Sequence, residues 1–129
     1  MLLGFKKQFR EYVKEGSKRH TIRANRKRPF RVGEICHCYT GLRTKNSELL
    51  GRWRCVKVAS IRISPGSDPM RVWINDEELS HSEIVLLAFA DGFRTETPAR
   101  SMREFWIHNH GCADFFGVII HWNYKEHVE

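Results

Sequence analysis

The sequence has no hydrophobic run long enough to cross a bilayer. Its longest apolar stretch, Ile84–Ala90, is much shorter than the roughly 20 residues that a membrane-spanning helix needs. The opening residues, MLLGFKK, place their charges after the apolar residues, which reverses the order found in a secretory signal. These absences predict a cytoplasmic protein without a membrane partner.

The sequence also gives little indication of a disulfide framework. A secreted domain of this size would use an even set of cysteines as covalent cross-links. Here the four cysteines lie in apolar segments, where a reduced thiol behaves as a small hydrophobic side chain. We therefore expect reduced, structural cysteines at Cys36, Cys38, Cys55 and Cys112.

Metal-binding motifs are missing as well. Cys36 and Cys38 are separated by one residue, which is tighter than the usual spacing of a zinc knuckle. The alternating His108, His110 and Cys112 have no second pair of ligands at a convincing spacing. The sequence predicts no metal site and no cofactor.

The chain lacks internal repeats, low-complexity tracts and linkers that would divide it. A length of 129 residues fits one domain, and a chain of this size can bury a sizeable core without a disulfide or a metal. Apolar residues make up 41% and charged residues 29%, which is ordinary for a globular protein. We predict a single domain spanning residues 1–129.

What the sequence does have is positive charge, concentrated near its start. Between Phe5 and Arg31 there are eleven Lys or Arg against two Glu, whereas the rest carries eleven against thirteen acidic residues. Such asymmetry indicates an anionic partner on one face, although an isolated charge run is often only a solvated surface.

The residue pattern predicts short strands and a few helices. An apolar stripe at Phe5, Phe9, Tyr12 and Val13 predicts a helix around residues 6–15, and Gly16 is a suitable residue to end it. Alternating or apolar segments predict strands at His20–Arg23, Ile35–Thr40, Trp53–Ile63, Arg71–Ile74 and Phe115–Trp122.

Two later segments complete the predicted fold. Ile84–Ala90 is apolar throughout and fits either a buried helix or a strand. Pro98 marks the start of a helix of about ten residues, with Thr95 or Thr97 as its cap. The set predicts an α+β fold, a small β-barrel of about five or six strands flanked by two or three helices.

Five segments of the chain, in order, resemble a known family. Gly16–Arg23 reads G-x-K-x-x-T-I-R after a short amphipathic helix, and it resembles the signature of ASCH domains, which have a PUA-like barrel. Val32–Ile35, Tyr39–Thr44, Ala90–Phe93 and Phe116–Trp122 resemble later elements of that family. The resemblance spans nearly the whole chain and implies the same barrel.

The resemblance also implies an activity. Some small ASCH proteins are amidohydrolases that deacylate N4-acetylcytidine with a threonine, a lysine and a glutamate, and others are ribonucleases or nucleic-acid binders. The matching positions are Thr21 for the threonine nucleophile and Lys18 for the base. The glutamate falls nearest Asp91, whose side chain is one methylene shorter.

Other residues of the same segments suit a ligand with phosphates and bases. Arg23 shares a strand face with Thr21, and its guanidinium can make paired hydrogen bonds. Arg19 and Arg43 could converge on the same cleft as surface cations. Tyr39 offers a ring for stacking on a base, although a strand tyrosine is more often in the core. Thr44 ends the Tyr-Thr-Gly-x-Arg-Thr match.

Three functions remain open at this stage. The first is a module that binds RNA or a modified nucleoside, favoured because the basic segment exceeds what one nucleoside needs. The second is an amidohydrolase acting through Thr21, Lys18 and Asp91, and the third is a ribonuclease. A structural reading is also open, in which Lys18 and Thr21 only cap the helix-to-strand junction. The sequence does not fix the oligomeric state.

Overall fold

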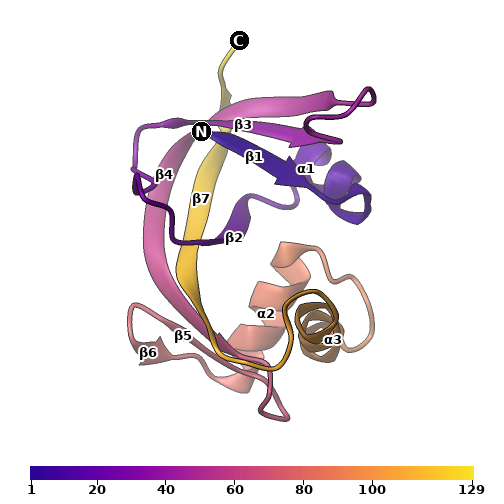
Figure 1. Cartoon of the computed structure of the whole chain (residues 1–129), viewed down its shortest axis with the longest axis vertical. Helices are drawn as coiled ribbons and strands as arrows, with labels where there is room; N and C mark the ends of the chain where they lie inside the picture. The colour runs from indigo at the N-terminus through magenta and orange to yellow at the C-terminus, as the bar shows by residue number, and fades with distance from the viewer. The chain divides into compact units, whose positions relative to one another are not determined.

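The computed structural model describes all 129 residues and has an α+β fold, with seven strands, three α-helices and one 3-10 helix (Figure 1). The strands are β1 (Leu2–Phe5), β2 (His20–Ala24), β3 (Ile35–Thr40), β4 (Glu48–Ser64), β5 (Arg71–Ile74), β6 (Glu77–Glu78) and β7 (Phe115–His127). The helices are η1 (Lys7–Phe9), α1 (Arg10–Glu15), α2 (His81–Asp91) and α3 (Pro98–His110).

The chain forms two compact units, each built from separate segments. Unit 1 comprises residues 1–21, 26–58 and 120–129, and unit 2 comprises residues 22–25 and 59–119. Strands β2, β4 and β7 each contribute residues to both units. The single domain therefore stays a prediction, and the units are described one at a time.

The strands pair as a branched sheet. Its main path runs β1-β3-β4-β5-β6, and β7 pairs with both β4 and β2. Because this path ends at β1 and at β6, closure into a barrel stays a prediction. The α+β class predicted from the sequence is confirmed.

Unit 1 has a core of aromatic side chains between paired strands. Strand β1 runs parallel to β3, and β3 runs antiparallel to β4, with an irregularity at Cys38 and Tyr39. Trp53 on β4 stacks on Trp122 of β7, with ring centroids 6.2 Å apart and planes 14° apart. Phe5 of β1 meets Trp122 edge-on at 6.0 Å. Aromatic pairs in these geometries add to the stability gained by burying the rings.

Unit 2 combines a meander of strands with two helices. Strand β4 pairs antiparallel with β5 from Ile61 opposite Ile74 to Ser64 opposite Arg71, and β5 pairs with β6. Helices α2 and α3 lie side by side (Figure 1). Their buried side chains, including Ile84, Met102 and Trp106, form an apolar core together with the inner side chains of the strands.

The ambiguous apolar segment Ile84–Ala90 is helical, and its start is strongly specified. Ser80 is the N-cap residue, and its hydroxyl accepts a hydrogen bond from the Glu83 backbone N–H at 3.2 Å. The Glu83 carboxylate in turn accepts from the Ser80 backbone N–H at 2.9 Å. This reciprocal capping box satisfies two amides that would otherwise lack partners at the helix start.

The first predicted helix differs from the observed structure. Phe5 belongs to strand β1, and the helical part begins with the 3-10 turn and continues as α1. Gly16 does end α1, as predicted, with a φ of 88°. Thr97 caps α3, which has 13 residues, but its side chain makes no capping hydrogen bond. None of the helices combines the length and apolar character needed to cross a membrane.

Candidate nucleic-acid interface

The junction between α1 and β2 is shaped by a glycine beneath a tyrosine ring. Gly16 adopts the left-handed conformation, and a Cβ placed on it would lie 2.5 Å from the Tyr124 ring. Tyr124 also donates its hydroxyl hydrogen to the Lys14 carbonyl at 2.8 Å. The segment that resembles the ASCH signature therefore begins at a position that only glycine fills without strain.

Two of the predicted catalytic residues are buried directly after this glycine. Lys18 is 3% exposed and Thr21 is 5% exposed, both within unit 1. The Lys18 Nζ lies 5.1 Å from the centroid of the Phe9 ring, a favourable cation–π distance. A lysine side chain is seldom this deeply buried, so the junction removes most of the Lys18 side chain from water.

The other two residues predicted near this pair belong to unit 2. Asp91 is the last residue of α2 and is 7% exposed, and Arg23 lies half-buried on β2. Their convergence with Lys18 and Thr21 stays a prediction.

The remaining predicted ligand residues lie on unit 1. Arg19 is exposed; its Nε donates to the Gly16 carbonyl at 2.6 Å, and its guanidinium lies 5.4 Å from the Tyr124 ring centroid. Tyr39 is half-buried on β3. Arg43 is exposed in the turn after that strand, with a φ of 68°.

The hydroxyl of Thr44 makes two hydrogen bonds within this turn. It donates to the Gly41 carbonyl at 2.6 Å and accepts from the Asn46 backbone N–H at 3.2 Å. These bonds stabilise the turn that carries Arg43, and the convergence of Arg43 and Thr44 on a cleft stays a prediction.

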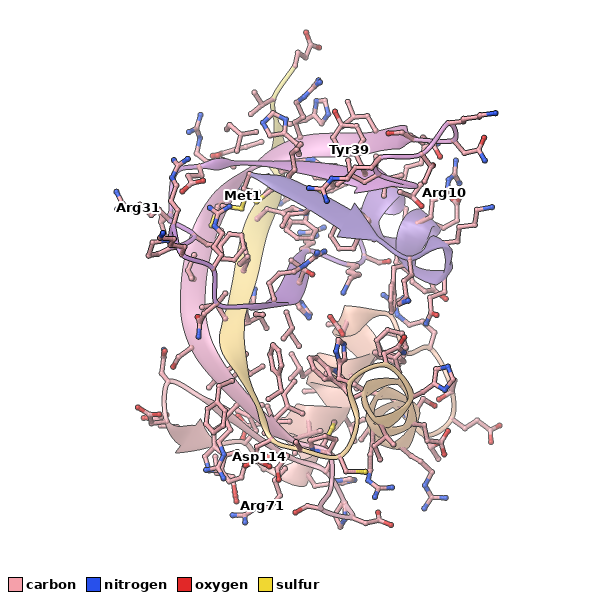
Figure 2. The ribbon with its side chains drawn as sticks, viewed as in Figure 1. Met1, Arg10, Arg31, Tyr39, Arg71 and Asp114 are labelled. Atoms are coloured by element: carbon pink, nitrogen blue, oxygen red, sulfur yellow. The ribbon has the colours of Figure 1, made fainter.

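The charge divides between the two units. Unit 1 has sixteen Lys or Arg against six Asp or Glu, a balance of +10, and unit 2 has six against nine, a balance of −3. Arg10 and Arg31 lie on opposite sides of unit 1 in Figure 2, so its positive charge is spread over a wide surface. A surface of this kind attracts a polyanion more than a small neutral ligand.

Some of these cations are held by carboxylates, and others are not. Arg10 makes two hydrogen bonds to Glu48, at 2.6 and 2.8 Å, which hold the pKa of Glu48 below its ordinary value. In the loop before β3, by contrast, four basic side chains lie within six positions. Arg26 stacks on Phe30 at 3.8 Å and pairs with Glu34 at 3.5 Å. Exposed side chains without an ion pair follow it at Lys27, Arg28 and Arg31.

A pair of histidines next to the junction was not predicted from the sequence. His20, on β2, and His121, on β7, have ring centroids 5.5 Å apart within unit 1. The pKa of His121 is lowered to about 4, mainly by burial and in smaller part by the nearby His20 and Lys57. His20 lies inside the signature segment, but only the structure shows its partner, a hundred residues later.

We expect this pair to make the protein less stable in mild acid. The folded-state pKa of His121 lies below its ordinary value of 6.5. Neutral His121 therefore makes its full contribution to the free energy of unfolding above pH 6.5, and this contribution is lost as the pH falls toward 4. The free energy of unfolding, measured with urea, should fall by roughly 2 kcal/mol between pH 7 and pH 5. His121→Gln should lose much less over this range, and an equal loss in both proteins would contradict the assignment.

The four cysteines are free thiols, and three of them are buried in unit 1. Burial raises the pKa of Cys36 to about 12, and it also raises the pKa of Cys55. Cys112, in unit 2, is exposed, unlike the other three. The structure has no group of three or more His, Cys, Asp or Glu side chains arranged to hold a metal ion.

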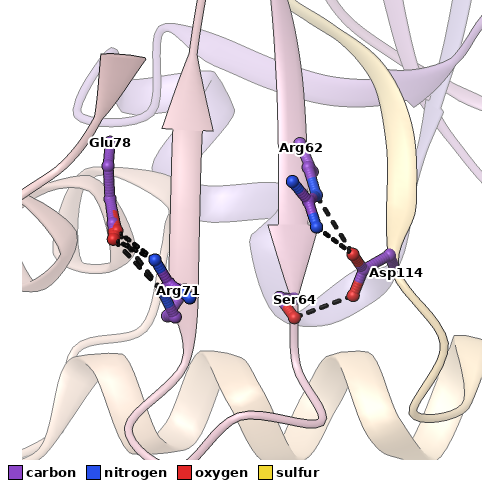
Figure 3. Close-up of polar contacts among 5 residues, drawn as sticks. All are labelled: Arg62, Ser64, Arg71, Glu78 and Asp114. Atoms are coloured by element: carbon purple, nitrogen blue, oxygen red, sulfur yellow. Dashed lines mark hydrogen bonds and ion pairs between the residues drawn. The ribbon is translucent and has the colours of Figure 1, made fainter. Parts of the chain in front are cut away.

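Two arginines on the strands of unit 2 are paired with carboxylates (Figure 3). Both the Nε and an Nη of Arg62 donate to Asp114, at 3.0 and 2.7 Å, and Ser64 donates to the other carboxylate oxygen at 2.7 Å. Arg71 makes a similar bidentate pair with Glu78. The two guanidinium groups also lie over Trp73, at 4.3 and 4.7 Å. The positive charges of Arg62 and Arg71 are therefore offset by the carboxylates of Asp114 and Glu78.

A pocket of about 260 Å³ in unit 2 is lined both by apolar side chains such as Met70 and Val85 and by charged side chains such as Glu96, Arg100 and Arg103. None of the predicted site residues lines it.

The chain was also compared with known proteins. No protein-family model, no curated protein and no solved structure matches it.

Proposed function

We propose that the chain is a cytoplasmic ASCH-type protein whose basic unit 1 binds RNA or a modified nucleoside, and that its strands close into a PUA-like barrel. The observation that carries the proposal is the division of charge, +10 on unit 1 against −3 on unit 2. Lys and Arg that neutralise phosphates release condensed counterions, which makes such a surface suited to a nucleic acid. The exposed loop cations and the ordered junction at Gly16 support the same assignment.

A titration with RNA at several salt concentrations tests this function. We expect a labelled single-stranded RNA of about 12 nucleotides to bind the full chain at 50 mM salt, measured by fluorescence anisotropy. The logarithm of the binding constant should fall linearly with the logarithm of salt concentration, by about 0.7 for each phosphate contacted. Absence of binding at 50 mM salt, or binding that salt does not weaken, would contradict a polyanion site.

A second candidate, deacylation of N4-acetylcytidine, is favoured by the burial of Lys18 and Thr21 at one junction. In this reaction the Thr21 hydroxyl would attack the acetyl carbonyl and lose its proton to a neutral Lys18 amine. The cytidine amine would leave, and water would then release acetate from the threonine. Asp91 would position the lysine.

Chromatography of N4-acetylcytidine incubated with the protein separates the two candidates. If the chain is an amidohydrolase, cytidine and acetate form, and Thr21→Ala should lower the rate at least a thousandfold while ligand affinity changes only a few-fold. Lys18→Arg should be nearly as damaging, because a guanidinium stays protonated. Turnover that survives in Thr21→Ala would rule out the nucleophile.

A further inference from the structure

The pocket of unit 2 is a preformed cavity between two helices and a loop. Its walls are the starts of α2 and α3 and the end of the loop before β5, which contributes Met70. Arg103 ties this loop to α3, because its Nε donates to the carbonyls of Pro65 and Ser67, at 2.9 and 3.0 Å. The walls are therefore held together without a ligand, and a preformed site lowers the entropic cost of binding.

The volume and the lining of the pocket limit the size and character of its occupant. The pocket measures about 260 Å³. A cavity of about 150 Å³ is enough for benzene, and drug-sized ligands need about 300 Å³ or more. The most buried side chains of the lining are apolar, namely Met70, Pro98 and Ala99. A ligand somewhat larger than benzene, with an apolar part of its own, fits this space.

Four Asp, Glu or Arg side chains also line the pocket, and only two of them are paired. Arg103 lies 3.9 Å from Asp68, so these two charges offset each other. Glu96 and Arg100 are exposed, and their side chains make no ion pair and no hydrogen bond. One carboxylate and one guanidinium are therefore available to a ligand that carries both a positive and a negative charge.

The positions of these two side chains suit a small zwitterion. Glu96 precedes the N-cap residue Thr97, and Arg100 lies in the first turn of α3. Both therefore lie at the same end of the helix. An arginine binds a carboxylate through paired hydrogen bonds, and a glutamate accepts hydrogen bonds from an ammonium group. An α-amino acid presents both groups on one carbon atom, with its side chain directed away from them.

We propose that this pocket binds a free α-amino acid with an aliphatic side chain of the size of leucine. Arg100 binds the α-carboxylate, and Glu96 binds the α-ammonium group. The aliphatic side chain packs against Met70 and Ala99. A polyanion is not expected here, because unit 2 has a balance of −3. The site is separate from the basic surface of unit 1, so the proposal does not depend on RNA binding. A ligand this small should bind weakly, with a Kd between about 10 µM and 1 mM.

NMR titration of the isotope-labelled full chain with L-leucine, up to about 20 mM, tests the proposal. The backbone amide signals of Val85, Ala99 and Arg100 should shift and saturate. Three analogues each lack one part of the ligand: glycine the side chain, 4-methylpentanoate the ammonium group, and 3-methylbutylamine the carboxylate. Each should bind at least tenfold more weakly than leucine. The absence of a saturating shift, or an analogue that binds as tightly as leucine, would overturn the proposal.

Charge-removing variants test the two polar contacts. Arg100→Ala and Glu96→Gln should each raise the Kd for leucine at least tenfold, because each leaves one charge of the ligand without a partner. Glu104 provides the matched control, since it is exposed on the same helix but does not line the pocket. Glu104→Gln should leave the Kd unchanged. If Glu104→Gln weakens binding as much as Glu96→Gln does, the assigned contacts are wrong.

A space-filling variant tests the apolar part of the site independently of its charges. Val85 lines the pocket from α2, so Val85→Phe should place a ring in the space of the leucine side chain and raise the Kd at least tenfold. Leu86, the next residue, is 69% exposed and does not line the pocket, so Leu86→Phe should bind leucine like the parent. Circular dichroism checks that both variants are folded. If folded Val85→Phe binds leucine as tightly as the parent, leucine binds elsewhere.

Discussion

Replacing Lys27, Arg28 and Arg31 together by alanine should weaken RNA binding roughly a hundredfold at 0.1 M salt. All three side chains are exposed and make no ion pair, so each is available to a phosphate. One contact on a single strand is worth about 0.7 log unit of affinity at this salt concentration, and three contacts together give about two log units. The slope of affinity against salt should fall by about 2, which fluorescence anisotropy measures directly.

The matched control for this prediction is Arg100→Ala. Arg100 is also an exposed arginine, but it belongs to the acidic unit 2. We expect Arg100→Ala to change the RNA affinity by less than about twofold, because it lies outside the basic surface. Surface charges contribute little to folding, so melting temperatures should stay within about 2 °C of the parent. If Arg100→Ala lowers the RNA affinity as much per charge removed as the triple variant does, RNA binding depends only on the net charge of the protein and not on the basic surface.

Gly16→Ala should be among the most destabilising single changes in the chain, at about 3 kcal/mol. A left-handed conformation costs a residue with a Cβ about 1–2 kcal/mol. The Cβ would also lie 2.5 Å from the Tyr124 ring, so the ring or the helix end must move, and overpacking of this kind typically costs 1–3 kcal/mol. Thermal unfolding should show a melting temperature lower by roughly 10–15 °C.

Another glycine separates the two causes. Gly33 has a φ of 94°, close to that of Gly16, but no atom lies within 4 Å of the Cβ it would carry. Gly33→Ala should therefore cost only about 1 kcal/mol. In a Tyr124→Ala background, Gly16→Ala should cost about as much as Gly33→Ala. If Gly16→Ala costs about 3 kcal/mol in both backgrounds, the ring contact is not the cause.

The sequence predicted elements with a clear local pattern and missed those that depend on distant partners. The alternation in β4 was recognised, as was the helix end at Gly16. Phe5 was assigned to a helix because it fits the apolar stripe, yet Leu2–Phe5 pairs with β3, more than thirty residues later. Local periodicity cannot reveal a partner at that distance.

The start of helix α2 carries a local pattern that resolves the ambiguity of the apolar segment after it. The segment Ile84–Ala90 was ambiguous because every residue in it is apolar. Ser80 and Glu83 precede it with the spacing of a capping box, and this pattern predicts a helix start.

The roles of the candidate site residues stay predictions, but their placement can be compared with the sequence. Composition indicated the basic segment and the resemblance indicated Lys18 and Thr21, and the structure shows both residues buried at one junction. The division of charge between units could not be predicted, because each unit is assembled from separate segments. The pairing of His20 with His121 depends in the same way on strands far apart in sequence.

The contrast among the thiols provides a native attachment point for a probe. Cys36, Cys38 and Cys55 are buried, and the raised pKa of Cys36 and Cys55 keeps those thiols protonated at neutral pH. Cys112 is exposed in unit 2, so a maleimide dye should label the folded protein there, once per chain and without any substitution. A second equivalent of dye should react only after denaturation, which turns labelling stoichiometry into a direct count of folded molecules.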